Sequence, residues 1–331
     1  MNETAPVIFP LAGKRVWVAG HRGMVGSALV RRLEREACTL LTVDRETLDL
    51  RRQAEVEAWM LANRPEVVFI AAATVGGILA NSTRPAEFLY DNLTIASNII
   101  SCAAKADVAK LMFLGAACLY PRLAPQPMSE DSLLEGPPEP TNEWYTVAKI
   151  AGVKLCQAYR KQHGCDFIVA VPANLYGPGD RFDTQSGHVV PGLIVRAHNA
   201  RMENASALSI WGTGKARREF MHVNDCADAL VFLMKTYSDP RIINVGTGEE
   251  VSIGELARTI CNVVGYSGAL AFDATKPDGM PRKLLNSSRI KEMGWRGRIE
   301  LDSGLRQTYQ WVLNNLLVRG GELASSGAAT Q

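Results

Sequence analysis

The sequence predicts an α/β protein with a doubly wound parallel sheet, completed by a smaller mixed α/β lobe. Between residues 14 and 171, short runs rich in Val, Ile and Leu alternate with longer segments of helical period, as a parallel sheet with crossover helices requires. These runs are apolar at nearly every position, so helices should cover both faces of the sheet. Beyond residue 172 the alternation gives way to short strands, helices and loops rich in Gly and Pro, which indicates a second, smaller unit.

The elements are expected in the following order. In the first part the strands are Arg15 to Ala19, Thr39 to Val43, Val67 to Ala71, Leu111 to Gly115 and Phe167 to Val171, and the helices are Met24 to Arg35, Gln53 to Leu61, Pro85 to Ala104 and Glu143 to Gln162. In the second part the strands are Leu208 to Trp211, Ile242 to Val245 and Leu270 to Phe272, and the helices lie near Asn224 to Tyr237, Ile253 to Val264 and Asp302 to Leu317. We therefore assign residues 1–172 mainly to the sheet domain and 173–318 mainly to the smaller lobe, from which segments can return to the sheet domain. Residues 319–331 are small and polar, so they are expected to form a disordered tail.

Charge and cysteine content exclude several classes of function. The 331 residues include 36 basic and 34 acidic ones, a net charge of +2, so there is no basic surplus for nucleic acid or an anionic membrane. The seven cysteines are scattered without a CxxC pair or a His-rich spacing, so we expect free thiols, a reducing compartment and no metal site. The first residues lack the basic region of a signal peptide, and no apolar run approaches the ~20 residues of a membrane span, so we expect a cytoplasmic protein.

The first expected strand ends in a glycine-rich turn that opens directly into a helix. The turn reads Gly20-His21-Arg22-Gly23-Met24-Val25-Gly26, with its glycines spaced GxxGxxG. Glycine lets the backbone turn tightly and approach a pyrophosphate, and a helix N-terminus offers free N–H groups to the anion. Glycine turns between a strand and a helix are common, but the position of this one, at the first such junction, predicts a Rossmann-type dinucleotide site.

The end of the second expected strand is where NAD and NADP are distinguished. An acidic residue there favours the ribose 2′-hydroxyl, and an arginine favours the 2′-phosphate. The chain reads Val43-Asp44-Arg45, in which Asp44 favours NAD and Arg45 favours NADP. Arg22 in the glycine turn adds a second guanidinium. Because guanidinium pairs well with phosphate, the sequence favours NADP(H) bound by Arg22 and Arg45; the alternative is that both arginines are solvated surface charges.

A YxxxK pair, Tyr145 and Lys149, lies at the start of the last helix of the first part. The i, i+4 spacing places the phenol and the ammonium on one helical face, where the cation can lower the pKa of the phenol. Tyr145 is therefore predicted to donate a proton to a substrate carbonyl. Such pairs usually lie on helix surfaces, but the nucleotide turn upstream favours the catalytic interpretation here.

With these motifs the chain resembles the extended short-chain dehydrogenase/reductases, from Lys14 to about Leu317. The specific strings are Gly20 to Ser27, Val75-Gly76-Gly77-Ile78, Pro140-Thr141-Asn142-Glu143, Asn174-Leu175-Tyr176-Gly177-Pro178, Arg218-Glu219-Phe220, Lys276-Pro277-Asp278-Gly279 and Pro281-Arg282-Lys283. Within that family it is similar to enzymes that epimerise GDP-4-keto-6-deoxy-D-mannose at C3 and C5 and reduce it at C4, giving GDP-L-fucose. The resemblance implies an NADPH-dependent oxidoreductase with isomerase activity.

The resemblance also assigns roles to two residues that no spacing singles out. A 4-ketone acidifies the hydrogens on C3 and C5, so a base on one face of the sugar and an acid on the other can invert both carbons. The resemblance implies that Cys118 is the base and His188 the acid. Without it, a lone Cys at a strand end is typical of a buried apolar residue, and a lone His of a surface or core residue.

Ligand contacts and assembly follow from the same resemblance. It implies cofactor contacts from Gly20, Arg22, Gly23, Met24, Val25, Gly26, Arg45, Lys149, Asn174 and His188. It places the nucleotide sugar in the smaller lobe against Arg196, Trp211, Arg218, Asp278 and Lys283; three of these are cations that suit a diphosphate, although each basic residue could instead be an exposed charge. The helices over Pro85 to Ala104 and Glu143 to Gln162 are too apolar for surface helices, and the resemblance implies that they form a homodimer interface.

One departure from the family pattern bears on the reduction. Similar proteins read Gly-Ser-Ser-Cys where this chain reads Gly115-Ala116-Ala117-Cys118, and the first of those serines would hydrogen-bond the C4 oxygen. Losing one such donor costs about 3 kcal/mol of transition-state stabilisation, so we expect reduction to be slowed rather than abolished. Two alternatives stay open: the same chemistry on a 3,6-dideoxy sugar, as in GDP-colitose synthesis, and a catalytically silent NADP-binding module.

Overall fold

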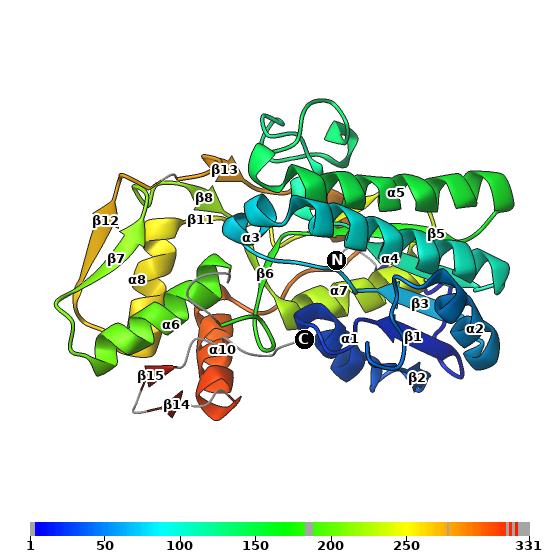
Figure 1. Ribbon diagram of the computed structural model, residues 1–331, viewed down its shortest axis with the longest axis horizontal. Coiled ribbons are helices and arrows are strands. Elements are labelled where there is room, and N and C mark those ends of the chain that lie inside the picture. Colours follow the sequence, from blue (N-terminus) through cyan, green and yellow to red (C-terminus); the bar gives the residue numbers. More distant parts are fainter. Residues whose placement is uncertain (1–3, 183–187, 277, 316–317, 320–321, 324–331) are drawn as a thin grey trace.

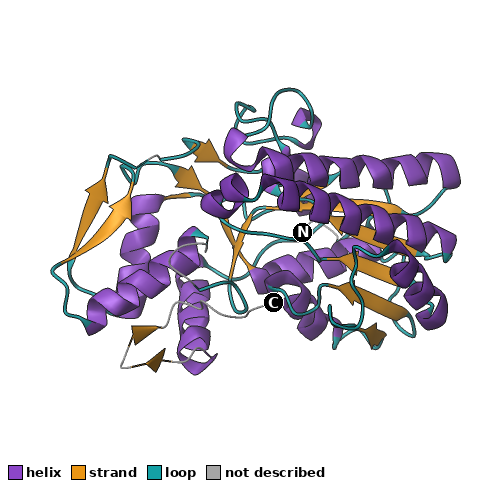
Figure 2. Cartoon of the chain, viewed as in Figure 1, coloured by secondary structure: helices purple, strands orange, loops and turns teal. Residues whose placement is uncertain are grey.

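A six-stranded parallel sheet forms the centre of the larger part of the molecule (Figures 1 and 2). The computed structural model describes residues 4–182, 188–276, 278–315, 318–319 and 322–323. The strand order is β2-β1-β3-β4-β5-β10. The strands are β1 (Arg15–Ala19), β2 (Thr39–Leu41), β3 (Val67–Ile70), β4 (Lys110–Leu114), β5 (Phe167–Pro172) and β10 (Ile243–Val245). Every residue of β3, β4 and β5 is buried, as expected for strands covered on both faces. The predicted α/β class with a doubly wound parallel sheet is confirmed.

Helices cover the two faces of this sheet as separate layers (Figure 1). One layer consists of α1 (Met24–Leu33) and α7 (Val223–Thr236), which pack against each other. The opposite layer consists of α2 (Gln53–Asn63), α4 (Pro85–Lys105) and α5 (Glu143–His163), with the short α3 (Ile78–Thr83) at its edge. The longest of these, α4 and α5, lie side by side over much of their length.

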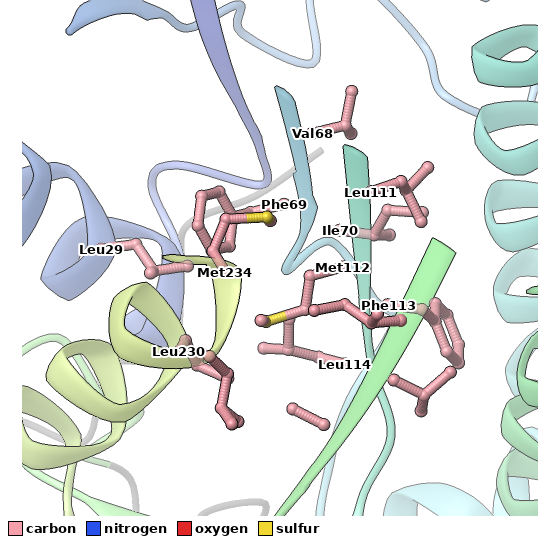
Figure 3. Close-up of a cluster of buried hydrophobic side chains, with 14 of the residues drawn as sticks. Leu29, Val68, Phe69, Ile70, Leu111, Met112, Phe113, Leu114, Leu230 and Met234 are labelled. Carbon is pink, nitrogen blue, oxygen red and sulfur yellow. The ribbon is translucent and has the colours of Figure 1, made fainter. Parts of the chain in front are cut away.

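The core fills the space between the sheet and both layers. Figure 3 shows Leu29 of α1 and Leu230 and Met234 of α7 gathered on one side of β3 and β4. Phe113 of β4 points to the other side, where a Cβ on Gly152 of α5 would lie 2.4 Å from its ring. The aromatic ring therefore packs directly on the backbone of α5, which brings the start of that helix close to the carboxyl end of β4.

The smaller lobe has its own hydrophobic core. Its helices are α6 (Val189–Met202), α8 (Ile253–Val264) and α10 (Leu301–Asn315), and β7 (Ala207–Trp211) pairs in parallel with β12 (Ala269–Asp273). Two further small sheets join it to the rest of the molecule: β6 (Asn174–Tyr176) with β9 (Phe220–His222), and β11 (Val251–Ser252) with β8 (Arg217–Arg218) and β13 (Arg282–Lys283). The short α9 (Ser288–Glu292) follows β13.

The chain crosses between the two parts more than once. After α6 and β7 it returns to the large sheet, where α7 packs on α1 and β10 pairs with β5. It then re-enters the smaller lobe with α8 and β12. The division into residues 1–172 and 173–318 remains a prediction. The segments α7 and β10 belong to the second range but pack with the larger part.

Helix α6 was not predicted from the sequence. Its first turn contains two β-branched residues followed by Pro191 and Gly192, a combination that disfavours a helix in isolation. It is also buried at six consecutive positions, from Val190 to Val195, so no continuous polar face gives it a 3.6-residue period. Tertiary burial stabilises this helix, and no local pattern shows it.

The helices and strands that the sequence predicts are present, with small shifts at their ends. The second strand ends at Leu41 instead of Val43, and α10 begins at Leu301 instead of Asp302. The predicted end of that helix, Leu317, lies outside the described residues. Most of the tail 319–331 lies outside the described residues, whereas β14 (Val318–Arg319) and β15 (Glu322–Leu323) form a short antiparallel pair. None of the described helices is long and apolar enough to cross a membrane.

Candidate active site

The glycine turn lies where the sheet changes direction. Strands β1 and β3 are neighbours, but β1 connects through α1 to β2 on one side and β3 connects through α4 to β4 on the other. The carboxyl ends of two such strands leave a crevice, which is the usual ligand site of a doubly wound sheet. Gly20 follows β1 at this point, and α1 begins at Met24 with Gly23 as its N-cap.

Two glycines of this turn are sterically required. Gly20 has a φ of +84°, and a Cβ there would lie 2.6 Å from the backbone of Ala72. A Cβ on Gly26 would lie 2.0 Å from the carbonyl oxygen of Gly20. The turn is therefore as tight as the predicted pyrophosphate site needs, and the first N–H groups of α1 face the crevice without a capping side chain. These residues fit a dinucleotide.

The arginines predicted to select NADP differ in their surroundings. The Arg22 guanidinium pairs with the Asp44 carboxylate, with Nε to Oδ1 and Nη2 to Oδ2 distances of 2.7 Å each. His21 approaches the same carboxylate at 3.2 Å. Asp44, three residues after the end of β2, is thus already paired with basic side chains. Arg45 is exposed beside it.

Three of the four predicted catalytic residues, Cys118, Tyr145 and Lys149, lie together at the end of β4, whereas His188 lies at the start of α6. Cys118 lies in a turn of 3₁₀ helix that follows this strand, and its carbonyl accepts a hydrogen bond from the Thr146 hydroxyl at 3.3 Å. Lys149 is buried and donates to the Leu114 carbonyl at 2.8 Å. Its ammonium lies over the Tyr145 ring, 5.7 Å from the centroid.

The predicted effect of Lys149 on Tyr145 is wrong. Burial raises the pKa of the Tyr145 phenol above its ordinary value, with a smaller contribution from the charge of Cys118. Burial also lowers the pKa of Lys149 to about 8. The cation contacts the face of the phenol ring and the backbone of β4, so the desolvation of the buried phenolate outweighs it. Tyr145 therefore keeps its proton at neutral pH, as a proton donor must.

His188 is the N-cap residue of α6, and its side chain is half-buried. The sequence did not single out its partner, Asp180: the two side chains approach to 3.5 Å between Nδ1 and Oδ1. The hydrogen bond to Asp180 raises the pKa of His188 above its ordinary value, against the opposing effect of burial. Asp180 is part of a Gly-Pro-Gly-Asp turn after β6, and nothing in the spacing across a loop indicates a contact with His188.

Two of the predicted substrate cations lie on neighbouring strands. Arg218 of β8 and Lys283 of β13 are directly paired in a parallel register. Burial lowers the pKa of Lys283, the charge of Cys118 raises it, and the positive charge of Arg218 lowers it further. Lys283 therefore lies within electrostatic reach of both Arg218 and Cys118.

The remaining predicted substrate residues lie further along the smaller lobe. Arg196 of α6 donates to the backbone carbonyls of Gly192 and Ser209. Trp211, at the end of β7, is 64% exposed, and the Lys276 ammonium lies 5.7 Å from its ring centroid. An exposed indole at the edge of a site is suited to stacking on a base.

Asp278 and Asn174 have local partners that the sequence did not indicate. Both carboxylate oxygens of Asp278 accept hydrogen bonds from Thr213, one from its amide and one from its hydroxyl, at 2.7 Å each. The Asn174 amide donates to the Glu219 carbonyl at 2.8 Å. Asp278 thus shapes the turn after Trp211 and has less capacity for sugar hydroxyls than was expected.

The chain is similar to known proteins over most of its length. A family model described as the NAD dependent epimerase/dehydratase family matches residues 16–246. A GDP-L-fucose synthase from Sinorhizobium fredii is 54% identical over 309 residues, covering 93% of this chain and 98% of that protein. GDP-L-fucose synthase 1 from Arabidopsis thaliana is 51% identical over 306 residues, covering 92% of this chain and 95% of its own length.

More distant relatives share the same architecture. A GDP-L-colitose synthase from Yersinia pseudotuberculosis is 34% identical over 302 residues, covering 91% of this chain and 98% of that protein. The crystal structure of a GDP-L-fucose synthetase from Naegleria fowleri bound to NADP has a TM-score of 0.86 and 27% identity, covering 95% of this chain and 98% of that one. Since the family model spans most of the chain and the relatives align with it over nearly their whole length, this chain belongs to the NAD dependent epimerase/dehydratase family, in its GDP-L-fucose synthase branch.

Proposed function

We propose that this chain is an NADPH-dependent epimerase and reductase that converts GDP-4-keto-6-deoxy-D-mannose to GDP-L-fucose. The observation that carries the proposal is the meeting of Cys118, Tyr145 and Lys149 at the end of β4, beside Lys283 of the smaller lobe. The GDP-L-fucose synthases among the relatives, which are about half identical over nearly their whole length, supply the substrate class.

The glycine turn and α1 would hold the cofactor. Their backbone fits a pyrophosphate, and Arg22 and Arg45 would receive the 2′-phosphate of NADPH. When bound, NADPH supplies the hydride for C4 of the sugar. Arg22 also neutralises Asp44, which would otherwise repel the 2′-phosphate.

The epimerisation would use residues on two sides of the sugar. The Cys118 thiolate removes the proton from C3 or C5, and the electron pair moves onto the C4 oxygen as an enolate. His188 then delivers a proton to the opposite face of the same carbon. Asp180 keeps His188 protonated and oriented for this step, because the imidazolium is stabilised by the adjacent carboxylate.

The reduction would depend on Tyr145, which delivers its phenolic proton to the C4 oxygen as hydride reaches C4. Lys149 balances the negative charge that this transfer leaves on the phenol, and its own position is fixed by the Leu114 carbonyl. Ala116 has extended backbone (φ −158°, ψ 153°) next to this turn and carries no hydrogen-bond donor in its side chain. The proposal therefore includes a reduction slower than that of a chain with serine at this position.

The smaller lobe would bind the GDP moiety. Arg218 and Lys283 lie close enough to pair with one diphosphate, and Trp211 lies further out where the base would reach. Arg196 extends the cationic surface from α6, although two backbone carbonyls already accept from it. Asp278 would act mainly by holding the Thr213 turn beside Trp211.

The proposal includes a homodimer formed by α4 and α5. Both helices leave apolar side chains exposed toward the same end of the outer layer: Tyr90 is 64% and Trp144 44% exposed, and Leu93 and Val147 accompany them one helical turn away. Two copies of this helix pair can bury these side chains against each other as a four-helix bundle.

A turnover assay tests the function. With GDP-4-keto-6-deoxy-D-mannose and NADPH we expect oxidation of the cofactor and formation of GDP-L-fucose, identified by the configuration at C3 and C5. A 3,6-dideoxy analogue assayed in parallel should react more slowly. Faster turnover of the analogue would favour the colitose-type reaction, and NADPH binding without turnover of either sugar would leave only a cofactor-binding module.

A further inference from the structure

Glu219 is a buried carboxylate at a junction of four segments. It lies between Arg218 of β8 and Phe220 of β9, and only 1% of its surface is exposed. Burial raises its pKa above the ordinary value. A carboxylate is expensive to bury unless several donors satisfy it, so its partners indicate what it is held there to do.

Three groups donate to the Glu219 carboxylate, and they come from two separate segments. Oε1 accepts from the Gly248 amide at 2.7 Å and from the Thr247 hydroxyl at 3.3 Å. Oε2 accepts from the Leu285 amide at 3.0 Å. The side chain thus joins the loop after β10 to the segment after β13.

The backbone of Glu219 adds two further links. Its amide donates to the Lys283 carbonyl at 3.2 Å, and its carbonyl accepts from the Asn174 side chain at 2.8 Å. The segment that carries Lys283 is therefore bonded to Glu219 at two points. The Lys283 carbonyl accepts from the Glu219 amide, and the Leu285 amide donates to the Glu219 carboxylate. Arg218, the residue paired with Lys283, directly precedes Glu219 in the sequence.

These links oppose a repulsion. Arg218 and Lys283 are like charges on adjacent strands, and the charge of Arg218 lowers the pKa of Lys283. Strands β8 and β13 contain only two residues each, so their ladder offers little resistance to separation. Glu250 joins the two strands from the surface through ion pairs with Arg217 of β8 and Arg282 of β13. The bonds to Glu219 add a buried restraint beside the Arg218 and Lys283 pair.

We infer that Glu219 is a positioning residue for nucleoside diphosphate binding: it fixes β13 against β8 so that Arg218 and Lys283 present a preformed pair of cations to two phosphates. This inference rests on the proposed function, which places the GDP moiety at these cations. Glu219 itself is too deeply buried to touch the ligand, so its effect is on the geometry of the pair and not on the chemistry at C3, C4 or C5.

The conservative change Glu219→Gln tests the hydrogen bonds of this side chain separately from its volume. A glutamine of the same shape keeps one acceptor oxygen and replaces the other by an amide NH₂ group. If the amide oxygen of the glutamine still accepts from Gly248 and Thr247, its NH₂ group faces the Leu285 amide. Both of these groups are donors, so no hydrogen bond can form between them. The link to β13 is then lost while the side-chain volume is unchanged.

The test measures the dissociation constants of GDP and of NADPH separately by titration calorimetry, together with KM and kcat. For Glu219→Gln we expect the Kd for GDP and the KM for the GDP-sugar to rise about tenfold or more. The Kd for NADPH and kcat at saturating sugar should stay within about threefold of the unchanged chain. A GDP Kd within twofold of the unchanged chain, or equal losses of GDP and NADPH affinity, would overturn the inference.

Two further variants keep the test decisive. Glu130→Gln is the matched control, because Glu130 is a buried carboxylate that accepts from the Asn244 amide and does not touch β8 or β13; it should leave GDP affinity unchanged. If Glu219→Gln does not fold, Gly246→Ala replaces it, since a Cβ there would lie 2.4 Å from Oε1 of Glu219 and displace the carboxylate. The same thresholds apply to it.

Failure of the proposed function would look different. If the unchanged chain binds GDP but does not turn over the 4-keto sugar, the proposed reaction is wrong. The GDP titrations then still test the positioning role of Glu219. If the chain turns over the sugar and Glu219→Gln leaves GDP binding intact, the reaction stands and the positioning role is wrong.

Discussion

The Nδ1 atom of His188 lies 3.5 Å from Oδ1 of Asp180, and this pairing raises the pKa of the imidazole. An acid in the epimerisation must be protonated, so exchange should fall as pH rises through the raised pKa of His188. Asp180→Asn removes the carboxylate and lowers that pKa, so the fall should occur at a lower pH. Solvent deuterium incorporation at C3 and C5, followed against pH, measures this.

Asp239→Asn is a suitable control for that experiment, since Asp239 pairs with Arg241 on the surface and should leave the pH profile unchanged. An Asp180→Asn profile that coincides with that of the unchanged chain would show that His188 does not owe its protonation to Asp180.

Cys118 is expected to be the base in the epimerisation. Cys118→Ser should abolish most deuterium incorporation while NADPH still binds, because a serine hydroxyl is a far weaker acid than a thiol and is hardly ionised near neutral pH. Cys165→Ser, at a partly buried thiol just before β5, should leave the exchange unchanged. Undiminished exchange in Cys118→Ser would assign the base to another residue.

Ala116→Ser should accelerate the reduction. A hydroxyl here would supply a donor to the C4 oxygen, and NADPH oxidation should rise about 10- to 100-fold, given ~1.4 kcal/mol per tenfold change in rate. Ala117→Ser is the matched control, because Ala117 is buried whereas Ala116 is partly exposed. If Ala116→Ser oxidises NADPH at the original rate, the alanine has no effect on the reduction.

The chain should bind NADPH more tightly than NADH. Arg45→Ala should narrow the ratio of the two dissociation constants, since the exposed Arg45 guanidinium can pair with the 2′-phosphate and has no counterpart in NADH. Arg52→Ala, in the same stretch but at the start of α2, should not change the ratio. Fluorescence titration of both cofactors gives these values, and equal affinities in the unchanged chain would contradict the prediction.

The outer face of α4 and α5 should be a dimer interface. Tyr90→Glu places a charge among apolar side chains and should shift the sedimentation mass at micromolar concentration from two chains to one. Leu61→Glu, at a similarly exposed leucine on α2, should not affect it. A single-chain mass for the unchanged protein would rule out the dimer.

Much of this fold is determined locally by the sequence. The apolar runs of β1, β3, β4 and β5 are visible as strands because burial on both faces requires nearly every residue to be apolar. The glycine turn is equally readable, since only glycine fits where a Cβ at position 26 would collide with the backbone of residue 20. Family resemblance then added Cys118 and His188, which no spacing could have marked.

Tertiary structure alone decided the rest, because it depends on contacts between segments far apart in the chain. Helix α6 is stabilised by burial over most of its length and shows no clear helical period in the sequence. The raised pKa of Tyr145 follows from desolvation, which the YxxxK spacing does not report. Asp180 and Glu219 look like ordinary acidic residues in the sequence. The roles proposed for them rest on contacts with the His188 side chain and the Leu285 amide, which form only once the chain has folded.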